Sequence, residues 1–177
     1  YDELIRVPLI VDVPGADSRR IETQVGLDSI PPTVTDLLDV APDPEWTGET
    51  LVPSVVSGTA PTDGPVVSVT VRGEKVTSQP IPRSLSDGDL LVSVRDRDWT
   101  YIENVDSGAT ELYHRPSDPT QQDDRSVDPT ADEQRVIERF APLVEGHVAS
   151  LRDRDEGPEA ADVDEELETR LEALGYR

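Results

Sequence analysis

LLVSVRDRDWTYIENVDSGATELYH, residues Leu90–His114, is the stretch that decides the fold of the second half of the chain. It contains three runs rich in β-branched and aromatic residues, Leu91–Arg95, Trp99–Val105 and Thr110–Tyr113, separated by the polar segments RDRD and DSG. Such runs are typical of strands, and Asp, Ser and Gly are typical of tight turns. Together with the alternating run Val66–Gly73 before it, the stretch predicts an antiparallel sheet of about four strands.

The segment after this sheet predicts helices. Within Asp128–Leu151, Thr130 and Glu133 have the spacing of an N-terminal capping box, and Pro142 is expected to kink or split the helix. VDEELETRLEALGYR, residues Val163–Arg177, predicts a last amphipathic helix after an acidic linker. The side chains expected to face a core are Trp99 or Tyr101 on the sheet, and Val136, Ile137, Phe140, Ala141, Leu143, Val144, Val148 and Leu151 on the helix.

The first part of the chain has a different pattern. RVPLIVDVP, Arg6–Pro14, is a continuous apolar run, which is typical of a strand buried on both faces of a parallel sheet. A short strand is expected within Ile21–Leu27, and a helix begins near Pro32. Residues 41–65, rich in Pro, Gly, Thr and Asp, predict a long crossing loop.

These patterns predict three parts. Residues 1–60 form the end of an α/β domain, residues 61–120 form a small antiparallel-sheet subdomain, and residues 121–177 hold C-terminal helices with an acidic linker. The fold class expected is therefore α/β, followed by a small α+β subdomain with a four-stranded antiparallel sheet.

The charge of the chain is strongly acidic, because 38 Asp and Glu face only 16 Lys and Arg, which gives a net charge of −22 over 177 residues. Low hydrophobicity with high net charge often indicates disorder, but here the apolar residues are clustered, which favours a folded domain with an acidic surface and some disordered stretches. The acids are spread along the chain, and Lys75 is the only lysine. This composition resembles that of proteins from salt-loving archaea, which favours a cytoplasmic protein in a high-salt organism over an ordinary protein with an acidic tail.

The same composition excludes several classes of function. No cluster of Lys and Arg is present to bind nucleic acid, and no run of about 18 apolar residues is present to span a membrane. The chain has no cysteine, so it has no disulfide and no thiolate chemistry.

Candidate site residues are few. None of the common hydrolase, metalloprotease or nucleotide-binding motifs is present, and the two histidines, His114 and His147, are expected to be structural or solvated. Lys75 and Arg83 lie in an inter-strand segment and could contact an anionic substrate at the rim of a cleft, although a solvated loop is the simpler reading. Trp46 is expected to be a packing residue. No catalytic or metal-binding residue can be assigned from the pattern.

Five segments, in order, resemble the C-terminal part of the sulfatase family. They are YDELIRVPLIVDVPG (Tyr1–Gly15), VGLDSIPPTVTDLLDV (Val25–Val40), GETLVP (Gly48–Pro53), Val94–Asp124 with its ELYH and DP motifs, and the tail LEALGYR (Leu171–Arg177). Each segment is short and of low specificity, but the order of all five matches the family.

The match departs from the family pattern at a few positions. Thr50 replaces a serine, Gln121 replaces a glutamate and Asp124 replaces an asparagine, while the place of an aspartate often found before the Pro-Thr pair falls on Ser29. The departures at Gln121 and Asp124 concern a turn and do not touch the family's chemistry.

The resemblance implies an alkaline-phosphatase-like fold and hydrolysis of sulfate esters. Sulfatases use a formylglycine, made from Cys or Ser in a C/S-x-P-x-R motif, and a calcium ion with oxygen ligands. All of these residues lie upstream of the part that the chain resembles. The resemblance therefore implies that the partner of this chain is a missing N-terminal catalytic half. This chain would itself bind neither cofactor, and it would be inactive and poorly stable alone.

Two alternatives stay open. One is a phosphodiesterase or phosphonate monoester hydrolase of the same superfamily, which the upstream nucleophile would distinguish. The other is a non-catalytic acidic interaction module.

Overall fold

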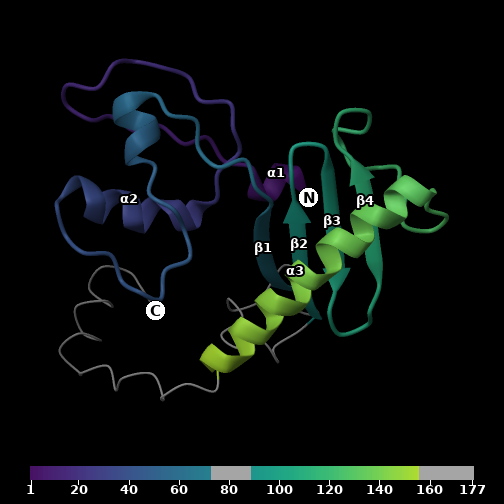
Figure 1. Ribbon diagram of the computed structural model, residues 1–177. Coiled ribbons are helices and arrows are strands. Elements are labelled where there is room, and N and C mark those ends of the chain that lie inside the picture. The colour runs from purple at the N-terminus through teal and green to yellow at the C-terminus, as the bar shows by residue number, and fades with distance from the viewer. Residues whose placement is uncertain (73–88, 156–177) are drawn as a thin grey trace, which may run out of the picture.

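The computed structural model describes residues 1–72 and 89–155 of the chain (Figure 1). In chain order the elements are α1 (Asp2–Ile5), the 3-10 turn η1 (Leu27–Ser29), α2 (Ile30–Leu37), the π-helical turn η2 (Pro53–Ser57), the strands β1 (Val66–Arg72), β2 (Asp89–Arg95), β3 (Trp99–Asn104) and β4 (Thr110–His114), and α3 (Ala131–Asp155). Lys75, Arg83 and the predicted helix Val163–Arg177 lie outside the described residues.

The four strands form one antiparallel sheet in the order β1-β2-β3-β4, as the sequence predicts. One cross-strand row contains Val67, Val94, Tyr101 and Leu112, each paired with the next. The β2–β3 turn is fixed by Asp96, whose Oδ1 accepts the backbone N–H groups of residues 98 and 99 at 2.9 and 2.7 Å. Asp at such a turn stabilises it through this local hydrogen bonding.

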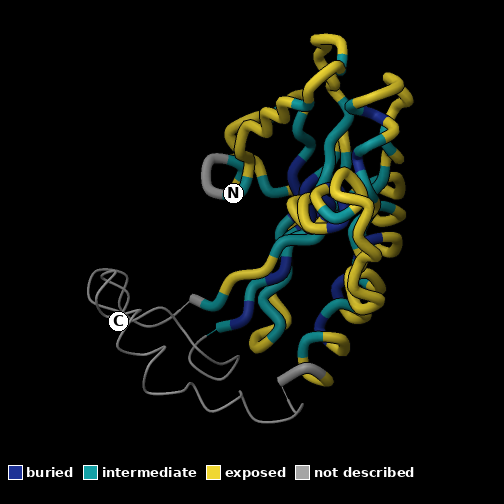
Figure 2. The backbone as a smooth tube through the Cα atoms, turned by 90° about the vertical axis from the view of Figure 1, so that its left-hand side faces the viewer, coloured by how far each residue is buried: buried dark blue, intermediate teal, exposed yellow. Residues whose placement is uncertain are grey.

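Helix α3 covers one face of this sheet, and the core lies between them (Figure 1). Buried side chains of the strands meet those of the helix there; they are Leu90, Val92, Val94, Tyr101, Leu112, Phe140, Val144 and Val148. Burial of an aliphatic or aromatic side chain of this size contributes about 1.5–3 kcal/mol. Figure 2 shows exposed and less exposed positions alternating along the helix, as expected for an amphipathic helix with one face on the sheet.

Helix α3 begins with the predicted capping box. The N–H of Glu133 donates to Thr130 Oγ1 at 3.3 Å, and the Glu133 carboxylate accepts the N–H of Thr130 at 2.7 Å. The expected split at Pro142 is wrong, because one α-helix continues through it, while a kink there stays a prediction. Pro142 is on the exposed side, so water can hydrate the backbone carbonyl of Glu138 that loses its partner.

Two predicted strands of the first part are absent. Arg6–Val13 runs as irregular backbone with Ile10 91% exposed, and no strand forms within Ile21–Leu27. A strand needs a neighbouring backbone to pair its N–H and C=O groups, and no described strand pairs with the backbone of either segment. The second segment reaches the sheet through a side chain instead, since Gln24 donates to the carbonyl of Arg95 in β2 at 2.9 Å. The predicted stop at Pro14-Gly15 is confirmed as a turn, with Gly15 at φ +85°.

Helix α2 and the loop after it are joined through Thr33. The buried Thr33 hydroxyl donates to the carbonyl of Ser29 at 2.6 Å and accepts the N–H of Leu51 at 2.8 Å. Gly48 lets the loop pass closely, because a Cβ there would lie 2.1 Å from the carbonyl oxygen of Asp28. The Pro-Thr segment and the GETLVP segment, separate in the sequence, therefore form one packed unit.

Candidate functional site

The start of the chain lies on the face of the sheet opposite α3 (Figure 1). The hydroxyl of Tyr1 donates to Glu111 at 3.1 Å, and its ring meets that of Tyr113 edge-on with centroids 6.1 Å apart. Tyr113 donates to the same Glu111 oxygen at 2.7 Å. Burial, followed by the bond to Glu111, raises the pKa of Tyr113 far above its usual value, so the phenol stays protonated and donating.

Asp2 is the centre of this contact. Its Oδ1 lies 3.1 Å from Arg95 Nη1, and its Oδ2 lies 3.5 Å from Arg115 Nη2. Its backbone N–H donates to Gln121 Oε1 at 3.0 Å. One carboxylate thus joins the end of β2 to the turn after β4, and we call Asp2, Arg95, Arg115 and Gln121 the junction cluster.

The members of the junction cluster are shielded from water. The side chains of Arg95 and Arg115 are 10% and 17% exposed, and Gln121 is 4% exposed. Gln121 holds a positive φ of 54°, a conformation uncommon for residues other than glycine. Because the strained Gln121 and two arginine side chains converge on Asp2, the start of the chain has a defined position on the sheet.

Not every N–H group of the two arginines in the junction cluster has a hydrogen-bond acceptor. Arg115 donates from Nη1 to the carbonyls of Asp96 and Arg97 at 2.5 and 3.0 Å. The Nε atoms of Arg95 and Arg115 are buried and lack an acceptor in the described parts of the chain. Burial lowers the pKa of the Arg95 guanidinium; repulsion from Arg115 and Arg6 adds to this, and Asp2 opposes it.

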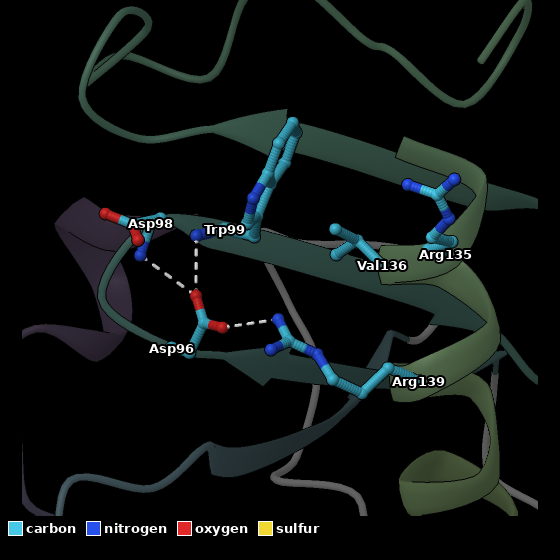
Figure 3. Close-up of a pocket in the computed structure, with 6 residues that line it drawn as sticks. All are labelled: Asp96, Asp98, Trp99, Arg135, Val136 and Arg139. Carbon is cyan, nitrogen blue, oxygen red and sulfur yellow. Dashed lines mark hydrogen bonds and ion pairs between the residues drawn. The ribbon is translucent and has the colours of Figure 1, made fainter. Parts of the chain in front are cut away.

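A second feature is a shallow hollow of about 290 Å³ between the β2–β3 turn and α3 (Figure 3). Trp99 and Val136 form its apolar part, and Asp96, Asp98, Arg135 and Arg139 form its polar part. Arg139 lies 2.6 Å from Asp96, and Arg135 pairs with Asp132. Since both arginines are already paired, the hollow offers no unpaired positive charge.

A third feature is a hollow of about 460 Å³ at the surface between α2 and the following loop. Its wall includes Trp46, which is 41% exposed and therefore only partly a packing residue, and three prolines, Pro32, Pro42 and Pro44. Asp36 at the rim accepts the hydroxyl of Thr50 at 2.7 Å. The lining of this hollow includes no Lys, Arg or His.

The two histidines differ in their surroundings: His114 contacts other side chains, and His147 is partly exposed. The ring of His114 contacts that of Trp99, with centroids 4.7 Å apart and planes tilted by 54°. Its Nδ1 lies 2.7 Å from the hydroxyl of Ser117. His147 lies half-buried on α3. Across residues 1–72 and 89–155, no group of three or more His, Cys, Asp or Glu side chains is arranged to hold a metal ion, and no helix there is long and apolar enough to cross a membrane.

The junction cluster is the site that sequence reasoning missed. Asp2 and Gln121 are 119 positions apart and belong to no shared motif. The only signals in the sequence were indirect: an arginine at the end of a strand, Arg95, and a glutamine within the turn after the DP motif. Chemically, the cluster can hold a chain segment in place and can attract an anion, but it contains no nucleophile.

Comparison with known proteins relates the fold to one group of hydrolases. No protein-family model matches the chain, and no curated protein matches it. Among solved structures, the phosphonate monoester hydrolase of Agrobacterium radiobacter matches 84% of this chain with a TM-score of 0.54 and 23% identity. A protein of Bacteroides thetaiotaomicron assigned as a sulfatase matches 77% of it with a TM-score of 0.51 and 20% identity.

A 2-O GAG sulfatase also matches 74% of the chain, with a TM-score of 0.50 and 18% identity. In each case the chain spans only about a quarter of the other protein, 26–29% of its length for these three. At these identities the likeness shows the fold alone. The expected fold class is confirmed: the chain has the fold of a C-terminal part of alkaline-phosphatase-like hydrolases, with a four-stranded antiparallel sheet and helices.

Proposed function

We propose that this chain is the C-terminal part of a sulfuric ester hydrolase that hydrolyses sulfate esters when joined to an N-terminal catalytic half. The fold likeness to sulfatases and the order of the five sulfatase-like segments support this proposal. In this proposal residues 1–60 complete the large α/β domain, residues 61–120 form the small subdomain, and residues 121–177 supply the C-terminal helices.

The observation that carries the proposal is the exposure of apolar side chains in the first 60 residues. Val7, Leu9, Ile10 and Val11 are 40–91% exposed in the segment whose pattern predicts a buried strand. Large exposed apolar patches usually mark a surface that another part of a protein covers. A sheet supplied by the catalytic half would cover these side chains and give Arg6–Val13 the strand partner that it lacks here.

The junction cluster fits a positioning role in this arrangement. It fixes Asp2–Ile5 on the small subdomain immediately before the segment expected to enter the large sheet. Formylglycine and calcium would both belong to the catalytic half, where they would supply the nucleophile and stabilise the sulfate. Lys75 and Arg83 remain candidate contacts for an anionic substrate at the rim of the cleft.

Phosphonate monoester hydrolysis is the alternative activity, because a phosphonate monoester hydrolase matches 84% of the chain, a larger share than the sulfatases match. The two proposals predict different motifs in the catalytic half, which would lie upstream of the part of the family that this chain resembles. A C/S-x-P-x-R motif in a longer form of the protein favours sulfate esters, and a lone Ser or Thr with a two-metal ligand set favours phosphoryl chemistry. A non-catalytic acidic module would lack both.

We expect residues 1–177 alone to hydrolyse neither 4-nitrophenyl sulfate nor a phenylphosphonate monoester, with or without Ca²⁺. No group of described side chains is arranged to hold a metal ion, and the exposed contact between Ser117 and His114 lines neither of the two hollows. A polypeptide that includes the catalytic half is expected to hydrolyse the sulfate and to lose that activity with EDTA. Activity of residues 1–177 that a chelator abolishes would contradict the division of labour proposed here. Activity of the longer polypeptide on the phosphonate alone would replace sulfate by phosphoryl chemistry.

A further inference from the structure

The hollow between α2 and the following loop, which we call the Trp46 hollow, combines an apolar wall with negative charge. Its volume is about 460 Å³, and small-molecule sites in proteins usually measure about 300–1,000 Å³. Most of its lining residues are proline, valine or tryptophan, and Asp36 and Asp43 are the only charged residues among them. A ligand that suits both the apolar wall and the two carboxylates is an organic cation.

The wall that carries Trp46 is held in place by short-range hydrogen bonds. The N–H of Trp46 donates to the carbonyl of Asp43 at 3.2 Å, and the N–H of Glu45 donates to the Asp43 side chain at 2.9 Å. On α2, Asp36 accepts the hydroxyl of Thr50 at 2.7 Å. Because Trp46 is still 41% exposed, a ligand can reach its ring without any change in the loop, and little ordering has to accompany binding.

The lining also selects the kind of cation. An ammonium or guanidinium group has N–H donors that lose hydrogen bonds to water unless they find acceptors, and the proline, valine and tryptophan side chains of the wall offer none. A quaternary ammonium ion has no N–H group to satisfy, so its methyl groups can pack on the apolar wall. The face of an indole ring attracts such an ion within about 6 Å of the ring centroid. The ring and the carboxylates therefore act on the same charge.

The hollow between the β2–β3 turn and α3 provides a contrast (Figure 3). It too combines a tryptophan with two aspartates, Trp99 with Asp96 and Asp98, but Arg135 and Arg139 line it as well. The two arginines balance the two aspartates, so this hollow has no excess negative charge to attract a cation. Trp99 is therefore an internal reference for Trp46.

We propose that the Trp46 hollow binds a quaternary ammonium ion of the size of choline, with its methylated nitrogen over the indole ring and beside Asp36 and Asp43. A single aromatic ring at the surface, rather than a closed cage, implies a dissociation constant of about 1 mM. This inference does not depend on the proposed activity, since it concerns only residues of this chain.

Titration of residues 1–177 with choline chloride tests the proposal, followed by the NMR signals of the indole N–H groups of the two tryptophans. Choline replaces an equal amount of Na⁺ at one fixed ionic strength at which the chain is folded, so the screening of the −22 net charge stays constant. We expect a saturable shift of the Trp46 signal and no shift of the Trp99 signal. The neutral alcohol 3,3-dimethyl-1-butanol has the shape of choline without its charge, and we expect it to bind about tenfold more weakly.

Asp43→Asn removes one charge from the lining and keeps an acceptor for the Glu45 N–H. We expect it to weaken the binding of choline about threefold, as for one carboxylate acting on a unit charge near the surface. Asp39→Asn is the matched control, because Asp39 is outside the lining and asparagine tolerates its positive φ of 55°. This control has the same net charge as Asp43→Asn and is expected to bind choline as tightly as the unmodified chain does.

Trp46→Leu keeps the wall apolar but removes the aromatic face. We expect it to lose most of the binding of choline, which the backbone N–H signals of Gly48 and Thr50 in the lining report in this variant. A Trp46 signal that does not shift with choline would overturn the proposal. Equal affinities for choline and the neutral alcohol would overturn it in favour of a purely apolar hollow, and equal weakening by Asp43→Asn and Asp39→Asn would overturn it in favour of general attraction to an acidic chain.

Discussion

At the scale of single residues, Thr33 shows how one hydroxyl joins two segments. It donates to the carbonyl of Ser29 and accepts the N–H of Leu51, and all of these groups are buried. Thr33→Val keeps the shape but leaves the Leu51 N–H without an acceptor, so we expect a loss of about 1–3 kcal/mol in the free energy of unfolding. Thr35→Val, which removes only bonds to the carbonyls of α2 itself, is the control for denaturant unfolding. Equal losses in the two variants would contradict the joining role of Thr33.

At the scale of the element, α3 depends on its capping box. Hydrogen bonds from the Thr130 hydroxyl and N–H lower the pKa of Glu133. Because the folded pKa lies below the unfolded value of about 4.3, the carboxylate stabilises the helix above that value. This stability is lost as the pH falls through the lower, folded pKa.

The unmodified chain should therefore lose stability as the pH falls from about 5 to below the unfolded value of about 4.3, and Glu133→Gln should lose less over the same range. Chemical denaturation followed by circular dichroism across this range is the measurement, and Glu138→Gln, on the same helix, is the control. A Glu133→Gln variant with the unchanged pH profile would show that the carboxylate contributes nothing to the stability of α3.

The same scale explains which elements could be predicted. The four strands and α3 follow from local signals: alternation, Asp-rich turns and a capping box whose bonds lie within a few residues. Arg6–Val13 has an equally clear apolar pattern, but a strand forms only where another backbone meets it, and no described strand does. The junction cluster joins residues 119 positions apart, so no local sequence pattern could have predicted the contact between Asp2 and Gln121.

At the scale of the whole molecule, charge and exposed apolar surface act together. The acidic side chains that give the net charge of −22 repel one another in the folded state. Ile10 and its apolar neighbours are exposed at the same time. Salt shortens the range of that repulsion to about 3 Å at 1 M and also strengthens apolar burial for some ions. The folded chain should therefore be more stable in molar salt than in dilute buffer.

Melting in increasing sodium gluconate tests this expectation. We expect the Tm to rise steadily with the ionic strength, because salt screens the repulsion among the acidic side chains and favours apolar burial. Coincident melts at low and at molar gluconate would show that the acidic surface does not depend on salt, and the likeness of its composition to that of salt-adapted proteins would then have no consequence for stability.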